Sequence, residues 1–242
     1  MDMAAFFTVH QDLPREGPGA PEDVAWACDL AGVAADAVVL DAGAGPGGDV
    51  AALLAAVPAG RVVAVDTHAD FVAAMQARFT DEPRLTARVQ SMAEAADFPE
   101  VPFDLIWCAG ALYFLGLEDG IATLSKALKP GGALAFSHPC FFTRNPSPQA
   151  QAFWEGETAP PLFVDDLVAK VEALGARVLG HRKVSDAGWE AYYQPMEARI
   201  ASLRSGADAA LTKALDANAA EARHWRDVRD ETGYLLMVLT WA

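Results

Sequence analysis

Four glycines follow one apolar stretch and could bring the backbone close to a ligand. In "VVLDAGAGPGGDV" (residues 38–50), Gly43, Gly45 and Gly48 spell G-x-G-x-x-G, whereas Asp41, Gly43, Gly45 and Gly47 spell D-x-G-x-G-x-G. Glycine permits close backbone approach, and the helix expected next offers free N–H groups. The first pattern is typical of dinucleotide sites and the second of a different adenosine ligand, so the glycines alone leave the ligand open.

Polar side chains also follow the later apolar stretches. Asp66 ends "RVVAVD", where a carboxylate can accept hydrogen bonds from ribose hydroxyls of either ligand. Tyr113 follows "FDLIWC" and could orient a substrate. His138 follows "ALAFS", and because histidine titrates near neutrality we expect it to act as a catalytic base. A histidine satisfied by the backbone of a tight turn is the alternative.

Short apolar segments alternate with segments of helical periodicity. The segments expected to be strands are 37–41, 61–66, 85–89, 103–108 and 133–137, and the segments expected to be helices are 47–56, 69–79 and 117–128. This alternation predicts an α/β fold, with a parallel sheet covered by helices on both faces. In such sheets ligands bind beyond the carboxyl ends of the strands, where the polar residues above lie.

The pattern changes after Ser137. Residues 141–161 are expected to be a loop with a short helix, 164–174 a helix, and 177–184 and 234–241 strands. Between the last two strands the chain is largely helical and too structured for a plain loop, so we interpret it as a cap. We expect one domain over 1–242. Its segments are an N-terminal lid (1–36), a cofactor-binding core (37–140), a loop, helix and strand (141–184), a helical cap (185–232) and the last strand (233–242).

The ordered motifs "VLDAGAGPG", "VVAVD", "FDLIWCAGALYFL" and "LKPGGALAFS" resemble those of class I methyltransferases that use S-adenosylmethionine (SAM). The likeness covers about residues 36–140, and outer motifs such as "WRDVRDETGY" extend it to bacterial small-molecule methyltransferases of undefined substrate. It implies a doubly wound, mostly parallel, seven-stranded Rossmann-like sheet with a helical cap before the last strand. It also implies a SAM-dependent methyltransferase that releases S-adenosylhomocysteine (SAH).

The resemblance implies a set of cofactor-binding residues. They are Arg15, Asp41, Gly43, Gly45, Gly47, Asp66, Thr67, Met92, Ala93, Cys108 and Gly110. Many relatives have an acidic residue near position 92, where this chain has Met92, so adenine would rely on the thioether, apolar packing and the backbone. No acidic cluster calls for a catalytic metal. His138 and Tyr113 are the candidate catalytic residues.

Several side chains of the outer segments are candidates for the acceptor pocket. Aromatic residues that could wall it are Phe141, Phe142, Trp154, Trp189, Tyr192, Tyr193 and Trp225. Arg144, Arg199 and Arg226 could pair with an acidic acceptor, although surface exposure is the simpler expectation for each. Two rival functions stay open, a nucleotide-dependent (NAD-type) oxidoreductase and a SAM-binding protein without catalysis.

The composition of the chain excludes some classes of binding partner. The net charge of −15 would repel nucleic acid and an acidic membrane surface. No apolar run reaches the ~18 residues that span a bilayer. The cysteines Cys28, Cys108 and Cys140 are widely spaced without a C-x-x-C motif, which favours reduced thiols in the cytoplasm. The resemblance implies a small-molecule acceptor, and a homodimer stays open.

Overall fold

Parallel strands form the centre of the molecule. The computed structural model describes residues 2–156 and 161–241 of the 242-residue chain; residues 1, 157–160 and 242, which fall within the predicted lid, loop and last strand, lie outside the described residues. The described strands are β1 (Val38–Ala42), β2 (Arg61–Asp66), β3 (Leu85–Val89), β4 (Phe103–Cys108), β5 (Leu128–Phe141), β6 (Leu162–Phe163), β7 (Arg177–Lys183) and β8 (Thr232–Thr240).

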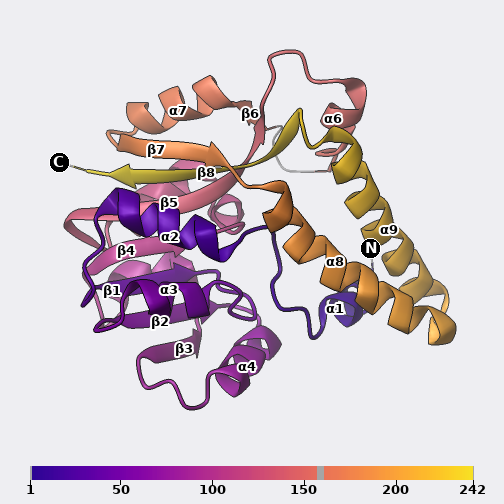
Figure 1. Ribbon diagram of the computed structural model, residues 1–242, viewed down its shortest axis with the longest axis horizontal. Helices are drawn as coiled ribbons and strands as arrows, with labels where there is room; N and C mark the ends of the chain where they lie inside the picture. Colours follow the sequence, from indigo (N-terminus) through magenta and orange to yellow (C-terminus); the bar gives the residue numbers. More distant parts are fainter. Residues whose placement is uncertain (1, 157–160, 242) are drawn as a thin grey trace.

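These strands form one sheet in the order β3-β2-β1-β4-β5-β8-β7, with β6 paired to the end of β5 (Figure 1). Strands β1 to β5 run parallel where they are neighbours, and β8 runs antiparallel to both β5 and β7. The order reverses direction at β1, which pairs with β2 on one side and β4 on the other. The predicted fold class is confirmed, and the two-residue strand β6 is an addition.

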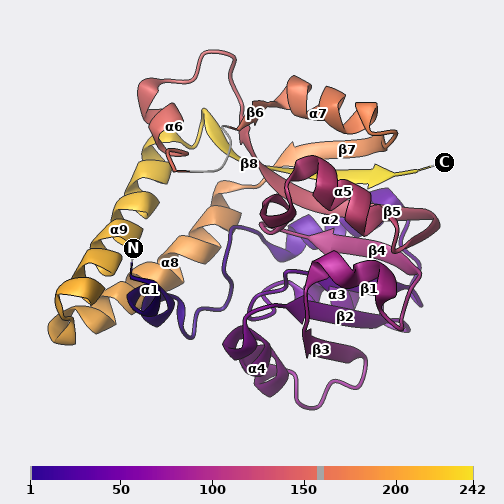
Figure 2. The same cartoon turned by 180° about the vertical axis from the view of Figure 1, so that it is seen from behind.

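Helices cover both faces of the sheet (Figures 1 and 2). The α-helices are α1 (Met3–His10), α2 (Pro21–Ala31), α3 (Val50–Ala56), α4 (Ala69–Arg78), α5 (Leu117–Ser125), α6 (Pro148–Ala152), α7 (Val164–Ala173), α8 (Asp186–Leu203) and α9 (Ala209–Val228). Short 3₁₀ helices are η1 (Met92–Asp97), η2 (Leu112–Leu115) and η3 (Arg204–Gly206). Helices α2, α3 and α4 pack into one core, and η1, α5 and α7 pack into the other.

Each strand supplies alternate residues to the two cores. Val39 and Val62 join the core under α2 and α3, whereas their neighbours Leu40 and Val63 join the core under α5 and α7. Because both faces are covered, the strands must be apolar throughout, which explains the continuous apolar runs in the sequence.

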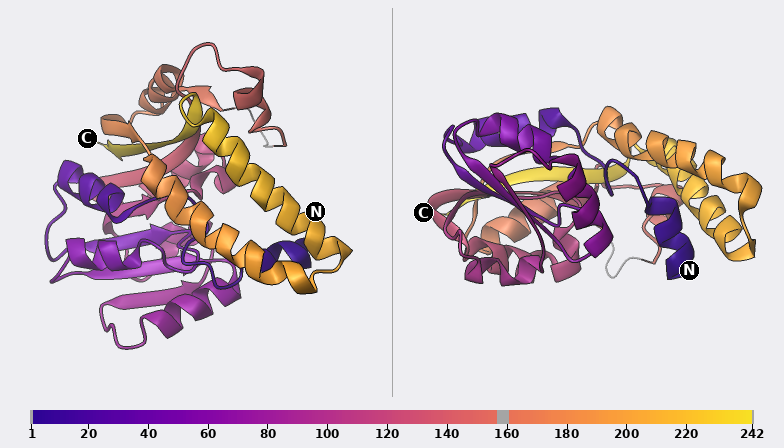
Figure 3. Two further views of the ribbon diagram at one scale, coloured as in Figure 1. Left: turned by 45° about the vertical axis from the view of Figure 1, so that its right-hand side comes forward. Right: turned by 90° about the horizontal axis from the view of Figure 1, so that it is seen from below.

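Helices α8 and α9 project beyond the carboxyl edge of the sheet, and α1 lies against them (Figure 3). Inside this cap the rings of Trp189 and Trp225 stack with centroids 5.0 Å apart. Both rings belong to the same apolar cluster as α2, α3 and the sheet residues that they cover. Nowhere in residues 2–156 and 161–241 is there a helix with the length and apolar character that crossing a bilayer requires.

Several elements differ from the sequence-based expectation. Helix α3 begins at Val50 rather than residue 47, because Gly47 (φ +81°) belongs to the preceding turn. Helix α5 ends at Ser125, and "LKPGG" forms the start of β5, which continues to Phe141. The N-terminal lid contains α1 and α2, which the sequence pattern had not indicated.

Candidate active site

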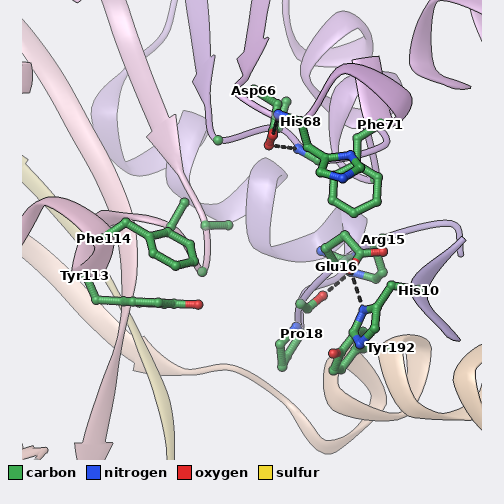
Figure 4. A pocket seen from close by; sticks show the side chains of 18 of the residues that line it. His10, Arg15, Glu16, Pro18, Asp66, His68, Phe71, Tyr113, Phe114 and Tyr192 are labelled. Atoms are coloured by element: carbon green, nitrogen blue, oxygen red, sulfur yellow. Dashed lines mark hydrogen bonds and ion pairs between the residues drawn. The ribbon is translucent and has the colours of Figure 1, made fainter. Parts of the chain in front are cut away.

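A cavity of about 890 Å³ opens between the carboxyl ends of β1, β2 and β4 and the cap. Its walls include the glycine turn after β1, η2 after β4, and residues of α1, α8 and α9. Figure 4 shows Asp66, His68 and Phe71 on one side of the cavity, and Tyr113 and Phe114 across from them. The volume lies within the range of roughly 300–1,000 Å³ that is usual for cofactor and small-molecule sites.

The glycine turn forms the floor beside β1. Gly43 and Gly45 line the cavity with φ angles of +78° and +53°. A Cβ atom on Gly43 would lie 2.5 Å from the Cβ of Ala111, so only glycine fits there. Gly47 does not line the cavity; it packs against Met75, and Gly48 lines the cavity instead.

The carboxylate of Asp66 ties the end of β2 to this turn. One oxygen accepts a hydrogen bond from the Gly45 N–H at 2.8 Å, and the other accepts one from the His68 N–H at 2.8 Å. Asp66 and Thr67 both line the cavity, as predicted. The Asp66 carboxylate is therefore held in place at the cavity wall.

Asp41 is a buried carboxylate at the carboxyl end of β1. Its side chain is 3 % exposed, it lines the cavity, and its Oδ2 atom has no hydrogen-bond partner. Burial, with Asp49 and Asp66 nearby, raises the pKa of this carboxyl well above its usual value, and only Arg15 opposes the shift. An uncompensated buried carboxylate is costly unless a cation or donor joins it.

Arg15 lines the cavity but is already engaged. Its guanidinium donates to the Gly17 carbonyl (2.5 Å) and the Gly19 carbonyl (2.5 Å), and pairs with Asp49 at 3.1 Å. Asp49 also accepts a hydrogen bond from the Trp107 indole N–H at 3.0 Å. The sequence reasoning missed Asp49, because an acidic residue before a helix is ordinary. This network fastens the segment before α2 onto the glycine turn.

Of the other residues predicted to bind the cofactor, some line the cavity and some are buried behind its wall. Met92 and Gly110 line the cavity, and the Gly110 N–H donates to Ser137 Oγ at 2.8 Å. Cys108 is fully buried behind Met92, with the two sulfurs 3.8 Å apart, and does not line the cavity. Ala93 does not line the cavity either, whereas Ser91, two residues before it, does.

His138 lies away from the cavity. Side chains along β5 alternate, so Ser137 reaches Gly110 of the cavity wall and His138 points to the opposite face. Its Nδ1 lies 3.0 Å from the Pro139 carbonyl, and burial lowers the pKa of the imidazole. Its charged neighbours are Lys170 and Glu118. The base role expected of His138 has no support in this placement, whereas Tyr113 does line the cavity.

A chain of polar contacts through His10, Glu16 and Asn218 joins the lid to the cap. The Nδ1 atom of His10 lies 2.6 Å from Glu16 Oε2, and its Nε2 atom lies 3.2 Å from Asn218 Oδ1. All three side chains line the cavity. No local sequence signal links them, because His10 and Asn218 are 208 positions apart.

Only some of the residues predicted to form the acceptor pocket line the cavity. Trp154, Trp189 and Tyr192 line the cavity, and the cavity lining does not include Phe141, Phe142, Tyr193 or Trp225. The three arginines bind elsewhere. Arg144 pairs with Asp165 and Asp166, Arg199 bonds the Thr8 carbonyl, and Arg226 pairs with Glu190 and Glu197.

Comparison with known protein families identifies the domain that contains this site. Residues 39–132, which carry the glycine turn and Asp66, match the family described as "Methyltransferase domain". The chain contains a methyltransferase domain. A search of the curated proteins finds no match.

Solved structures share the fold of this chain over nearly all of its length. A SAM-dependent methyltransferase from Geobacter sulfurreducens, in complex with SAH, superposes with a TM-score of 0.83 at 18% identity, covering 99% of this chain and 98% of that one. One from Thiobacillus denitrificans, also with SAH, has a TM-score of 0.82 at 17% identity, covering 98% of both. Geranyl diphosphate C-methyltransferase from Streptomyces coelicolor, with Mg²⁺, geranyl diphosphate and SAH, has a TM-score of 0.62 at 17% identity, covering 91% and 79%. The predicted family resemblance and enzyme class are confirmed.

Proposed function

We propose that this methyltransferase transfers the SAM methyl group to a small molecule bound between the sheet edge and the cap. The observation that carries the proposal is the pair of carboxylates at the ends of β1 and β2, Asp41 and Asp66, on either side of a glycine turn inside one cavity. SAH in two similar structures supports SAM as the cofactor.

The residues present fit SAM. Asp41 has a buried, unpartnered oxygen that a cationic methionine ammonium would satisfy. Gly43 leaves the backbone bare where a side chain would clash, so the ligand can lie against the turn. Asp66 would accept hydrogen bonds from the ribose hydroxyls, and Met92 would pack against adenine in the apolar manner expected for this chain.

Bound SAM supplies a methyl group that its sulfonium activates for in-line displacement. The protein's part is positioning, which can remove roughly 7–11 kcal/mol of a barrier in favourable cases. Phe7 stacks on His68 with ring centroids 4.2 Å apart, so α1 reaches over the β2 side of the cavity. Together with α8 and α9, α1 would exclude water from the reacting pair.

A small-molecule acceptor is supported by the size of the cavity and by the geranyl diphosphate in the Streptomyces structure. The three cysteines are buried and unpaired, which fits the predicted cytoplasmic setting.

Asp66→Ala tests the cofactor assignment. Because a hydrogen bond to a charged group contributes about 1.5–3 kcal/mol, we expect SAH to bind about 10- to 100-fold more weakly in calorimetric titration. Asp70→Ala removes an exposed carboxylate at the start of α4 and serves as the control, with unchanged affinity. Equal SAH affinity in Asp66→Ala would show that the ribose lies elsewhere. NADH binding without SAH binding would favour the oxidoreductase instead.

A further inference from the structure

The cavity is strongly acidic beyond the two carboxylates assigned to the cofactor. Its lining also includes Glu16, Asp49, Glu155 and Glu221, whereas Arg15 is the one Lys or Arg side chain among the described lining residues. Arg15 is already paired with Asp49. An anionic acceptor would therefore meet repulsion without a free cationic partner, and a cationic one would be attracted.

Glu16 is the carboxylate best placed to meet an acceptor. Its side chain is 19% exposed, and its Oε1 atom is buried without a hydrogen-bond partner. A Cβ atom on Gly45 would lie 3.5 Å from the Glu16 Cγ, so Glu16 packs against the glycine turn assigned to SAM. Figure 4 shows its partner His10 beside Tyr192, on the cap side of the cavity. Glu16 thus lies between the cofactor site and the cap.

The other oxygen of Glu16 is held by a histidine of fixed orientation. Asn218 donates its amide N–H to the Ala214 carbonyl at 2.9 Å, which turns its Oδ1 toward His10 Nε2. His10 Nε2 therefore faces the Asn218 oxygen as a donor, and His10 Nδ1 lies 2.6 Å from Glu16 Oε2. Glu16 Oε1 is the oxygen left to accept a proton from a substrate.

Aromatic rings line the cavity on more than one side. Tyr192 and Trp189 of α8, Tyr234 of β8, Tyr113 of η2 and Trp154 all line it. The Tyr234 hydroxyl is hydrogen-bonded to Tyr113. Faces of such rings attract cations, and the attraction grows when both partners are desolvated.

We propose that the acceptor is an amine, whose nitrogen binds to Glu16 Oε1 among these aromatic rings and passes a proton to that oxygen. This inference rests on the proposed function and adds the substrate class and the residue that receives the proton. Glu16 is the catalytic residue, and His10 is a positioning residue that acts through it.

The amine enters as an ammonium ion, its N–H bond breaks, and that proton moves to Glu16 Oε1. The free nitrogen lone pair then forms a bond to the SAM methyl carbon while the carbon–sulfur bond breaks. The electron pair of that bond stays on sulfur and gives neutral SAH. The methylated ammonium product leaves, and Glu16 returns its proton to solvent.

Binding of matched probes tests the substrate class directly. With SAH present, we would titrate phenethylamine, N-methylphenethylamine and butylamine, each against the alcohol and the carboxylate of the same carbon skeleton. We expect the amines to bind at least 10-fold more tightly than their partners. If SAH binds but the carboxylates or alcohols bind best, or no amine binds, the amine inference is wrong while the proposed function stands. If SAH itself does not bind, the proposed function fails first.

Glu16→Gln tests the role of the carboxylate in turnover. We expect SAH affinity within about threefold of the wild type and kcat/KM for the best amine reduced by about 10²–10⁴-fold, the usual contribution of a general base. Glu172→Gln, an exposed carboxylate on α7, controls for the loss of one negative charge. Undiminished turnover in Glu16→Gln would overturn the proposal.

His10→Gln separates positioning from simple structural support. The titratable groups that face Glu16 are His10 from α1, Asp66 and His68 at the end of β2, and Tyr192 from α8. Burial raises the Glu16 pKa and His10 lowers it, so loss of His10 should move the acidic limb of kcat to higher pH. An unchanged pH profile, with SAH affinity intact, would show that His10 does not act through Glu16.

Discussion

Asp41 shows how one residue can be unfavourable for the empty protein and favourable for the complex. Its carboxyl is buried at the end of β1, and one oxygen has no partner. A ligand cation beside it would remove an existing penalty as well as add a new attraction. The position therefore exchanges some stability of the free enzyme for cofactor affinity.

Replacement of Asp41 by Asn should separate these two effects. Because the folded pKa lies above the unfolded one, the ionised carboxyl destabilises the fold at high pH, and this penalty disappears as pH falls through the folded pKa. We expect Asp41→Asn to raise the Tm of the ligand-free protein at pH 8, by roughly 2–4 °C for each kcal/mol relieved, with a smaller gain at lower pH.

The same variant should bind SAH about 10-fold more weakly or worse, because a charge-assisted hydrogen bond is lost. Calorimetric titration and thermal unfolding across pH provide both measurements. The exposed Asp36→Asn is the matched control. A Tm gain without loss of SAH affinity would mean that Asp41 does not meet the cofactor.

At the scale of elements, one arginine links the segment between α1 and α2 to the glycine turn and the sheet. The planar fork of Arg15 contacts two carbonyls of its own segment and the carboxylate of Asp49. Trp107 of β4 holds the other oxygen of that carboxylate. The lid is therefore anchored to the sheet through a geometry that only a guanidinium provides.

Arg15→Lys keeps the positive charge and the trypsin cleavage site but loses the planar guanidinium, which donates several hydrogen bonds at once. We expect trypsin to cleave after residue 15 several-fold faster than in the wild type, and SAH to dissociate faster in stopped-flow experiments. Arg177→Lys, at the exposed start of β7, should change neither rate. Wild-type cleavage and dissociation rates in Arg15→Lys would show that the ion pair alone holds the segment.

Sequence patterns predicted the elements of the sheet better than the side chains of the site. The glycine turn, the positions of Asp41 and Asp66 at strand ends, and the alternation of strands and helices were readable because local spacing dictates them. His138 was misplaced because β5 continues to Phe141 rather than ending near Ser137, so alternation turns His138 to the other face. The contact between His10 and Asn218 was not readable, because only the folded cap brings those positions together.

At the scale of the whole molecule, the cap and the sheet share one core. Trp189 stacks on Trp225 inside the cap and lies 5.2 Å from the ring of Tyr234 on β8. Deletion of residues 190–230 would therefore remove part of the central core as well as part of the acceptor pocket, so its effect on activity would not separate the two. A single substitution in the cap separates them better.

Trp225→Ala should destabilise cap and sheet together. Trp225 is 1% exposed, and truncation of such a ring costs about 3–5 kcal/mol. We expect native-state hydrogen exchange to accelerate by a similar factor in α8, α9 and the central strands, because the unfolding unit is common to both. Faster exchange confined to α8 and α9 would show that the cap opens independently.

The contact between His10 and Asn218 also sets an order of events during synthesis. Helix α1 is translated well before its partner helix α9, because His10 and Asn218 are 208 positions apart. A nascent chain can form β1 to β5 and the glycine turn before α9 exists, when α1 has only the β2 side of the cavity to contact. Closure of the lid against the cap therefore waits for α9, and His10 gains its contact with Asn218 only after that helix has been made.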